Sequence, residues 1–185
     1  MIARRLLLGL LLALAACGRR EPEADCGPSQ RVVDPVLLAF LSQARSAHHI
    51  ADLREADDDV PAALRALQAL TAAPRPPGDA PEVEEVLADT QARSADLLSR
   101  AGRFDQAEAE IGAGLENAKA PTYFRGHLYE VRGLLEERRE KALRSTGRGQ
   151  EADQARDRSL AAYEEAMRIQ SEVIARAAPA LSAPK

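Results

Sequence analysis

The chain has 185 residues, with 3% aromatic residues, no tryptophan and abundant alanine, leucine, glutamate and arginine. This length allows one domain of ordinary size, and the composition favours helix over sheet, so the sequence predicts an all-α protein. A net charge of −4 argues against nonspecific binding of nucleic acid, which needs a positive surface.

The N-terminal segment is typical of a targeting signal. Arg4 and Arg5 supply a positive start, and an apolar run from Leu6 to Ala16 follows, too short to cross a membrane. The run ends in Leu14-Ala15-Ala16-Cys17, which resembles the lipobox of bacterial lipoproteins. That resemblance implies a signal peptide over residues 1–16, cleavage before Cys17 and lipid on the Cys17 thiol. An ordinary secretory peptide or a buried N-terminal helix are the alternatives.

The segment after the signal predicts a tether. Loss of residues 1–16 would bring the net charge to −6, and residues 17–33 show no helical periodicity, so we expect a flexible lipid-anchored linker. Gly18 stands where an aspartate would favour inner-membrane retention in Gram-negative bacteria, so the resemblance favours the outer membrane. Cys26 would then either pair with another chain or remain a free thiol.

The first helix is predicted to begin at Asp34-Pro35 and to run to about Ala56. Its buried face is expected to be broad, with Ile50 and Leu53 beside the main apolar stripe. That stripe contains Leu37, Phe40, Leu41, Ala44, Ala47 and Ala51. Asp57-Asp58-Asp59 then lacks the spacing of a calcium loop, and predicts a turn and a helix cap rather than a metal site.

Two further helices are separated by a proline-rich break. The first spans Val60 to Ala72, and the break over residues 73–81 cannot be helical. Pro81 then opens a helix that continues to about Ser99.

The stretch from Leu97 to Leu115 predicts a helical hairpin. Gly102 can adopt the left-handed conformation that ends a helix, and Asp105 can cap or charge the start of the next one. Ala107, Ile111 and Gly114 then recur at helical spacing, which lets two helices approach closely. This pattern resembles a tetratricopeptide repeat, and the resemblance implies about three antiparallel hairpins stacked as a short solenoid.

A third hairpin is predicted to be elongated. It begins near Thr122, turns over residues 145–149, and places Gly133 and Tyr163 where the repeat family has a small and a bulky residue. Its outer part, over residues 136–141 and 151–158, is highly charged and predicts a solvated arm or a charged docking arm. We expect the helical domain to span residues 34–178, its last helix to end near Arg176, and residues 179–185 to be a disordered tail.

No motif for catalysis is evident. A serine elbow, a phosphate loop and a zinc-protease helix are all absent from the sequence. His48 and His49 are adjacent, so they point about 100° apart on a helix and cannot chelate together. We therefore expect no enzyme activity, no cofactor and no metal.

The repeat resemblance implies that the first helices of the hairpins line a concave, peptide-binding face. Its exposed positions would be Arg54, Glu55, Asp96, Ser99, Arg100, His127, Glu130, Glu137 and Arg138. The sequence thus predicts a lipid-anchored lipoprotein that acts as a scaffold for another envelope protein. A purely structural bundle lipoprotein and a small-ligand carrier or enzyme remain as alternatives.

Overall fold

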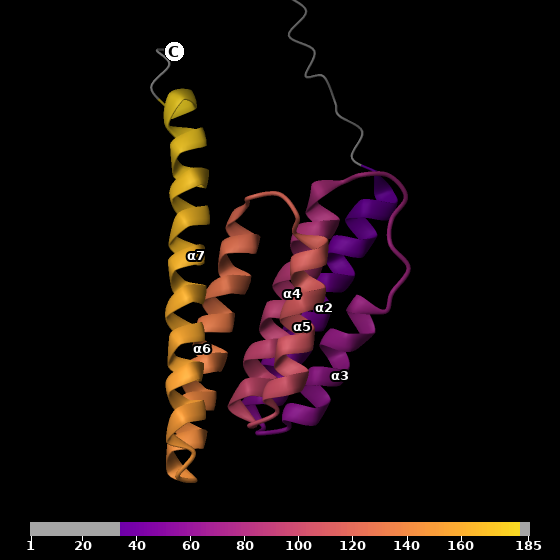
Figure 1. The fold of residues 1–185 in the computed structure, drawn as a ribbon. Helices are drawn as coiled ribbons and strands as arrows, with labels where there is room; N and C mark the ends of the chain where they lie inside the picture. Colours follow the sequence, from indigo (N-terminus) through magenta and orange to yellow (C-terminus); the bar gives the residue numbers. More distant parts are fainter. Residues whose placement is uncertain (1–33, 182–185) are drawn as a thin grey trace, which may run out of the picture. The chain divides into compact units, whose positions relative to one another are not determined.

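The computed structural model describes residues 34–181, with side chains to residue 177, and this part of the chain is entirely helical (Figure 1). The helices are α2 (Pro35–Ala56), α3 (Val60–Thr71), α4 (Pro81–Arg100), α5 (Phe104–Asn117), α6 (Tyr123–Ser145) and α7 (Gly149–Leu181). The predicted all-α class is confirmed. The predictions for the signal peptide, Cys17, the tether and Cys26 lie outside the described residues.

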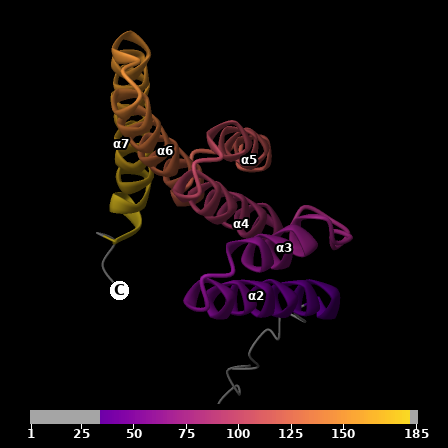
Figure 2. The same cartoon turned by 90° about the horizontal axis from the view of Figure 1, so that it is seen from below.

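The helices form three antiparallel hairpins, α2 with α3, α4 with α5, and α6 with α7. Helix α4 is central, because it packs against α2, α3, α5 and α6 (Figure 2). The first helices of the hairpins, α2, α4 and α6, therefore follow one another through the structure. Hairpins that are further apart in the sequence therefore lie further apart along this row of helices.

One backbone arrangement closes all three hairpins. Asp58, Gly102 and Gly147 have φ values of 58°, 73° and 76°, in the left-handed region. In each turn the following amide reaches back to the first helix: Asp59 N to Arg54 O at 2.8 Å, Arg103 N to Leu98 O at 2.9 Å, and Arg148 N to Leu143 O at 3.0 Å. This is the Schellman pattern, which satisfies carbonyls left free at a helix end. Each hairpin therefore has the same local stop signal.

Side-chain caps begin α2, α3 and α6, whereas α4 and α5 have no such cap. The carboxylate of Asp34 accepts from Val36 N at 2.8 Å, that of Asp59 from Ala62 N at 3.0 Å, and the Thr122 hydroxyl from Arg125 N at 3.3 Å. These bonds satisfy amides that have no partner within the helix. The acidic triplet before α3 is thus a turn and a cap, as the sequence predicted.

The core is built from alanines and leucines at close helix contacts. Ala51, Ala63, Ala88, Ala92, Ala95 and Ala107 are fully buried, and Leu67, Leu97, Leu128 and Leu135 fill the spaces between them. Two glycines allow the closest approaches. A β-carbon at Gly114 would lie 2.5 Å from Leu128, and one at Gly133 would lie 2.6 Å from the Tyr163 ring. Small residues therefore set how closely the hairpins pack.

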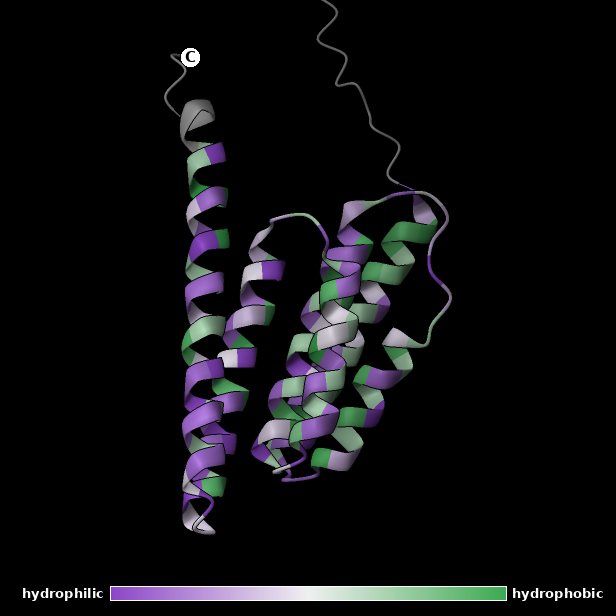
Figure 3. Cartoon of the chain, viewed as in Figure 1, coloured by the Kyte–Doolittle hydropathy of each residue, from purple (hydrophilic) through white to green (hydrophobic). Residues whose placement is uncertain are grey.

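Helix α2 departs from the predicted broad buried face. Ile50 and Leu53 are 48% and 55% exposed, because among the described residues α2 packs only against α3 and α4, through the other face of the helix. Its buried stripe is narrow and contains Phe40, Ala44, Ala47 and Ala51. Figure 3 shows that α2 is rich in hydrophobic residues, in contrast to the mostly hydrophilic α6 and α7.

The third hairpin is long, as predicted, with 23 residues in α6 and 33 in α7. Helix α7 continues beyond the expected end at Arg176 to Leu181, since the alanines on both sides of Pro179 favour helix. The charged outer part is not wholly solvated, because the Glu136 side chain is only 4% exposed. No helix among the described residues is both long enough and apolar enough to cross a membrane.

Candidate functional site

An ion-pair network joins the first helices of the three hairpins. Arg93 of α4 reaches two carboxylates of α2, with Nη2 2.6 Å from Asp52 Oδ1 and 2.5 Å from Glu55 Oε1. Its Nη1 also donates to the His48 carbonyl at 3.1 Å. Arg100, two turns further along α4, adds a second contact to Glu55 Oε2 at 2.8 Å. Helices α2 and α4 are therefore connected on one face.

The same network continues to α6. Asp96 of α4 forms ion pairs with Arg100 Nε at 3.1 Å and with Arg138 Nη1 of α6 at 2.8 Å. Arg138 Nη1 also lies 2.5 Å from the Ser99 hydroxyl. The structure thus brings together five of the predicted residues, Glu55, Asp96, Ser99, Arg100 and Arg138.

The inner and outer members of this network differ in exposure. The Arg93 and Glu55 side chains are each 22% exposed, whereas that of Arg100 is 50% exposed. Burial alone would raise the pKa of Glu55, but hydrogen bonds and charges from Arg93 and Arg100 together hold it below its ordinary value. Glu55 therefore stays ionised, and its two arginine partners remain paired with it.

The other predicted α6 residues are engaged with α7 or with each other. Glu130 accepts from Gln170 Nε2 at 2.8 Å and lies 3.2 Å from His127 Nδ1, and Glu137 accepts from the Tyr163 hydroxyl at 3.1 Å. Burial, followed by the hydrogen bond to Glu137, raises the pKa of Tyr163 to about 12. His127 and Glu130 thus pair with each other, while Glu137 is bonded to Tyr163 of α7, and none of the three contacts the ion-pair network on α4.

Sequence reasoning placed Arg54 on the same face but missed two members of the network. Arg54 lies exposed in the last turn of α2. Asp52 and Arg93 were not predicted, although Asp52 lies three residues before Glu55 and Arg93 seven before Arg100. Those spacings return a side chain to the same face of a helix, so they were the available signal.

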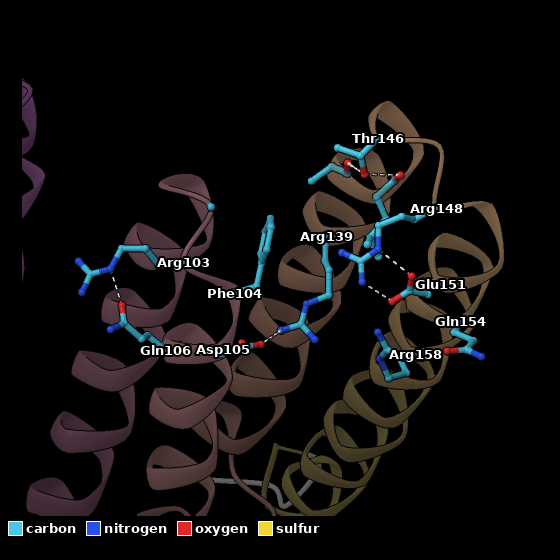
Figure 4. A pocket seen from close by; sticks show the side chains of 13 residues that line it. Arg103, Phe104, Asp105, Gln106, Arg139, Thr146, Arg148, Glu151, Gln154 and Arg158 are labelled. Carbon is cyan, nitrogen blue, oxygen red and sulfur yellow. Dashed lines mark hydrogen bonds and ion pairs between the residues drawn. The ribbon is translucent and has the colours of Figure 1, made fainter.

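A charged cleft lies on another part of the molecule, between the α4–α5 turn and the α6–α7 tip (Figure 4). It has a volume of about 760 Å³. Arg139 lies 3.3 Å from Asp105 and stacks over Phe104 at 5.6 Å, and Arg148 pairs with Glu151. Arg158 donates to the buried Glu136 at 2.8 and 3.0 Å. The arm that was predicted to be solvated or to dock a partner therefore contains internal ion pairs and one open hollow.

The described residues offer no set for metal chemistry. No three His, Cys, Asp or Glu side chains gather closely enough between residues 34 and 177 to hold an ion. His48 Nε2 instead lies 2.9 Å from the Thr90 hydroxyl, and burial lowers the pKa of His48. The charged and polar residues of the site can make polar and ionic contacts.

Comparison with known proteins identifies no relative. No protein-family model matches the chain, and no curated protein or solved structure matches it significantly. The function is therefore argued from the residues and their arrangement alone.

Proposed function

We propose that this chain is a bacterial lipoprotein, anchored through Cys17 to a membrane of the cell envelope, with the outer membrane favoured. Its three hairpins would stack as a short tetratricopeptide-like solenoid that binds a segment of another envelope protein. The face formed by α2, α4 and α6 is the binding surface. The protein acts as a scaffold and needs no cofactor.

The observation that carries this proposal is the grouping of predicted residues on one face. Glu55, Asp96, Ser99, Arg100 and Arg138 come from all three first helices and meet in one network. Three repeats are also near the minimum for a stable stack. Adjacent turns at residues 58, 102 and 147 are more widely spaced than the 34 residues of the repeat family, so the stack is an elongated form of that pattern.

A partner segment of mixed charge suits this face. The exposed members are of both signs, with the Asp52 side chain 59% exposed and that of Arg100 50% exposed. Exposed ion pairs contribute little to stability, so a partner can replace one at small cost. A uniformly basic clamp for a peptide carboxylate is not what these residues form.

A purely structural lipoprotein is the second candidate, and one observation favours it. The charged groups on the α2, α4 and α6 face already satisfy each other, so the face does not require a partner. On this hypothesis the network only fixes the angles between the first helices.

The test is site-specific photocrosslinking in intact cells, with the crosslinker placed at Arg54 or at Arg100 of the full chain. Binding predicts one discrete adduct that is lost when the two positions among Arg54, Arg100 and Arg138 that do not carry the crosslinker are changed to Glu. The matched control changes Arg65 and Arg156 to Glu, because these exposed arginines lie on α3 and α7. No adduct, or an adduct that survives the first set of changes, favours the structural lipoprotein.

The anchor is tested separately on the mature chain. Mass spectrometry of its N-terminal peptide should show cleavage before Cys17 and added lipid on that residue. Replacement of Cys17 by Ala should abolish both. A mature chain that begins elsewhere, without lipid, contradicts the lipoprotein proposal.

A further inference from the structure

The outward face of α7 has an apolar stripe. Leu160, Met167 and Ile174 are 52%, 67% and 69% exposed, and they are spaced seven residues apart. Seven residues make almost two helical turns, so the three side chains lie along one line of about 21 Å. The side of α7 that packs on α6 is formed by other residues: Ala152, Ala155, Ser159, Ala162, Ala166 and Ile169. Among residues 34–177 the stripe is therefore not covered by packing between helices.

We propose that this stripe binds the same stripe of a second copy of the chain, in an antiparallel pair of α7 helices centred on Met167. The stripe is symmetric about Met167, because Leu160 and Ile174 each lie seven residues from it. A two-fold axis at Met167 therefore places Leu160 opposite the partner's Ile174 and closes the assembly at two chains. This inference does not depend on the proposed scaffold function.

The polar residues beside the stripe select the antiparallel arrangement. Asp157, Glu164 and Ser171 are exposed and lie on the same outward face, again seven residues apart. A parallel pair would place Glu164 opposite Glu164 of the second copy, and Asp157 opposite Asp157. Both contacts are unfavourable, because they bring like charges together. The antiparallel pair places Glu164 near Ser171 of the second copy, whose hydroxyl can donate to the carboxylate, and places Asp157 near alanines.

The end of α7 is accessible to a second chain. Gln170 contacts Glu130 and Gly126 near the beginning of α6, so the part of α7 that includes Ile174 extends past its partner helix (Figure 1). A stripe of three side chains is small compared with the 1,200 Å² or more that stable interfaces bury. We therefore expect a reversible dimer whose population depends on concentration.

Cysteine crosslinking of the full chain in intact cells tests the arrangement, with Cys26 changed to Ser to remove its thiol. Met167→Cys should form a disulfide-linked dimer by itself, because the axis brings the two copies of residue 167 together. Leu160→Cys and Ile174→Cys should each crosslink poorly alone but efficiently when the two variants are expressed together. The chain that carries only Cys26→Ser measures any background crosslinking through Cys17.

Adding Leu160→Gln and Ile174→Gln to the Met167→Cys chain should lower the dimer yield at least tenfold. The matched control adds Val36→Gln and Leu38→Gln, which change similarly exposed apolar residues on α2, and should leave the yield unchanged. Efficient Leu160→Cys dimers without Ile174→Cys would overturn the antiparallel pair in favour of a parallel one. Absence of any Met167→Cys dimer, or crosslinking of Met167→Cys to Leu38→Cys instead, would overturn the proposal.

Discussion

The close approach of α6 and α7 depends on Gly133. Substituting this residue measures how much that approach contributes to the free energy of unfolding. A β-carbon at Gly133 would lie 2.6 Å from two atoms of the Tyr163 ring and 2.8 Å from a third. The ring cannot swing aside freely, because its hydroxyl donates to Glu137 at 3.1 Å. Gly133→Ala must therefore push the two helices apart or break that hydrogen bond.

Two opposing effects set the magnitude. Overpacking a close contact costs about 1–3 kcal/mol. Replacement of a helical glycine by alanine contributes about 0.5–1 kcal/mol in the other direction. We expect Gly133→Ala to lower the free energy of unfolding by about 1–2 kcal/mol. Gly112 of α5 is the control, since nothing lies within 4 Å of a β-carbon there, and Gly112→Ala should stabilise by about 0.5–1 kcal/mol.

Urea unfolding followed by far-ultraviolet circular dichroism provides the assay. The midpoints of the two variants should fall on opposite sides of the parent chain. In a Tyr163→Leu background, Gly133→Ala should no longer destabilise, giving a coupling energy of about 1 kcal/mol or more. If Gly133→Ala stabilises the parent chain as much as Gly112→Ala does, the reasoning about this helix contact is refuted.

Three further predictions concern single groups. Glu136→Gln should destabilise by about 1–2 kcal/mol, since it weakens a buried acceptor of Arg158, whereas Glu151→Gln in an exposed pair should leave the urea midpoint unchanged. Asp58→Gly should raise the thermal midpoint, with a gain of about 1 kcal/mol, because Asp58 has a φ of 58°; a loss would show that its side chain matters more. Burial lowers the pKa of His48 from its ordinary value of 6.5, so its contribution to stability is complete above pH 6.5 and is lost as the pH falls from 6.5 through the lower pKa of the folded state. His48→Gln should flatten this part of the pH profile of the urea midpoint, and a parent chain that gains stability over the same interval contradicts the assignment.

The ends of the helices were predictable because the signals are local. Gly102, Asp59 and Pro81 each act on the backbone within a few residues, through a positive φ, a cap or a missing amide. The all-α class followed from the composition and from the same signals for the starts and ends of helices. The sequence allowed three features of a hairpin to be placed without knowing how the hairpins pack. These are the end of a helix, the cap of a helix and a small residue at a helix contact.

The exposure of particular side chains could not be predicted in the same way. Ile50 and Leu53 are as apolar as the residues of the buried stripe, but among the described residues α2 has neighbours on one side only. Glu136 lies in a charged run that predicted solvent exposure, yet the packing of α7 on α6 covers it and Arg158 supplies its counter-charge. Both errors arise because the rotation of a helix about its axis is fixed by neighbours distant in the sequence.

The predicted binding face shows the same limit. Periodicity placed residues such as Glu55 and Arg100 on one side of their helices, and they do meet. It did not indicate that Arg93 would lie between α2 and α4 and neutralise Asp52 and Glu55. A list of exposed charges from sequence thus overestimates how many of them are free to bind.

This difference within the network bears on which residues a partner can use. Arg93 is largely covered, contacts two carboxylates and a carbonyl, and would leave the mostly covered Glu55 Oε1 and the His48 carbonyl without this donor if it moved. Arg100 is half exposed, and water can replace either of its contacts at little cost. The inner part of the network therefore fixes the angle between α2 and α4, while the exposed rim, with Asp52 and Arg100, is the part that can exchange an internal ion pair for one with a partner. A scaffold built in this way keeps its shape when it binds, because the contacts that it can give up are not the ones that hold its first helices together.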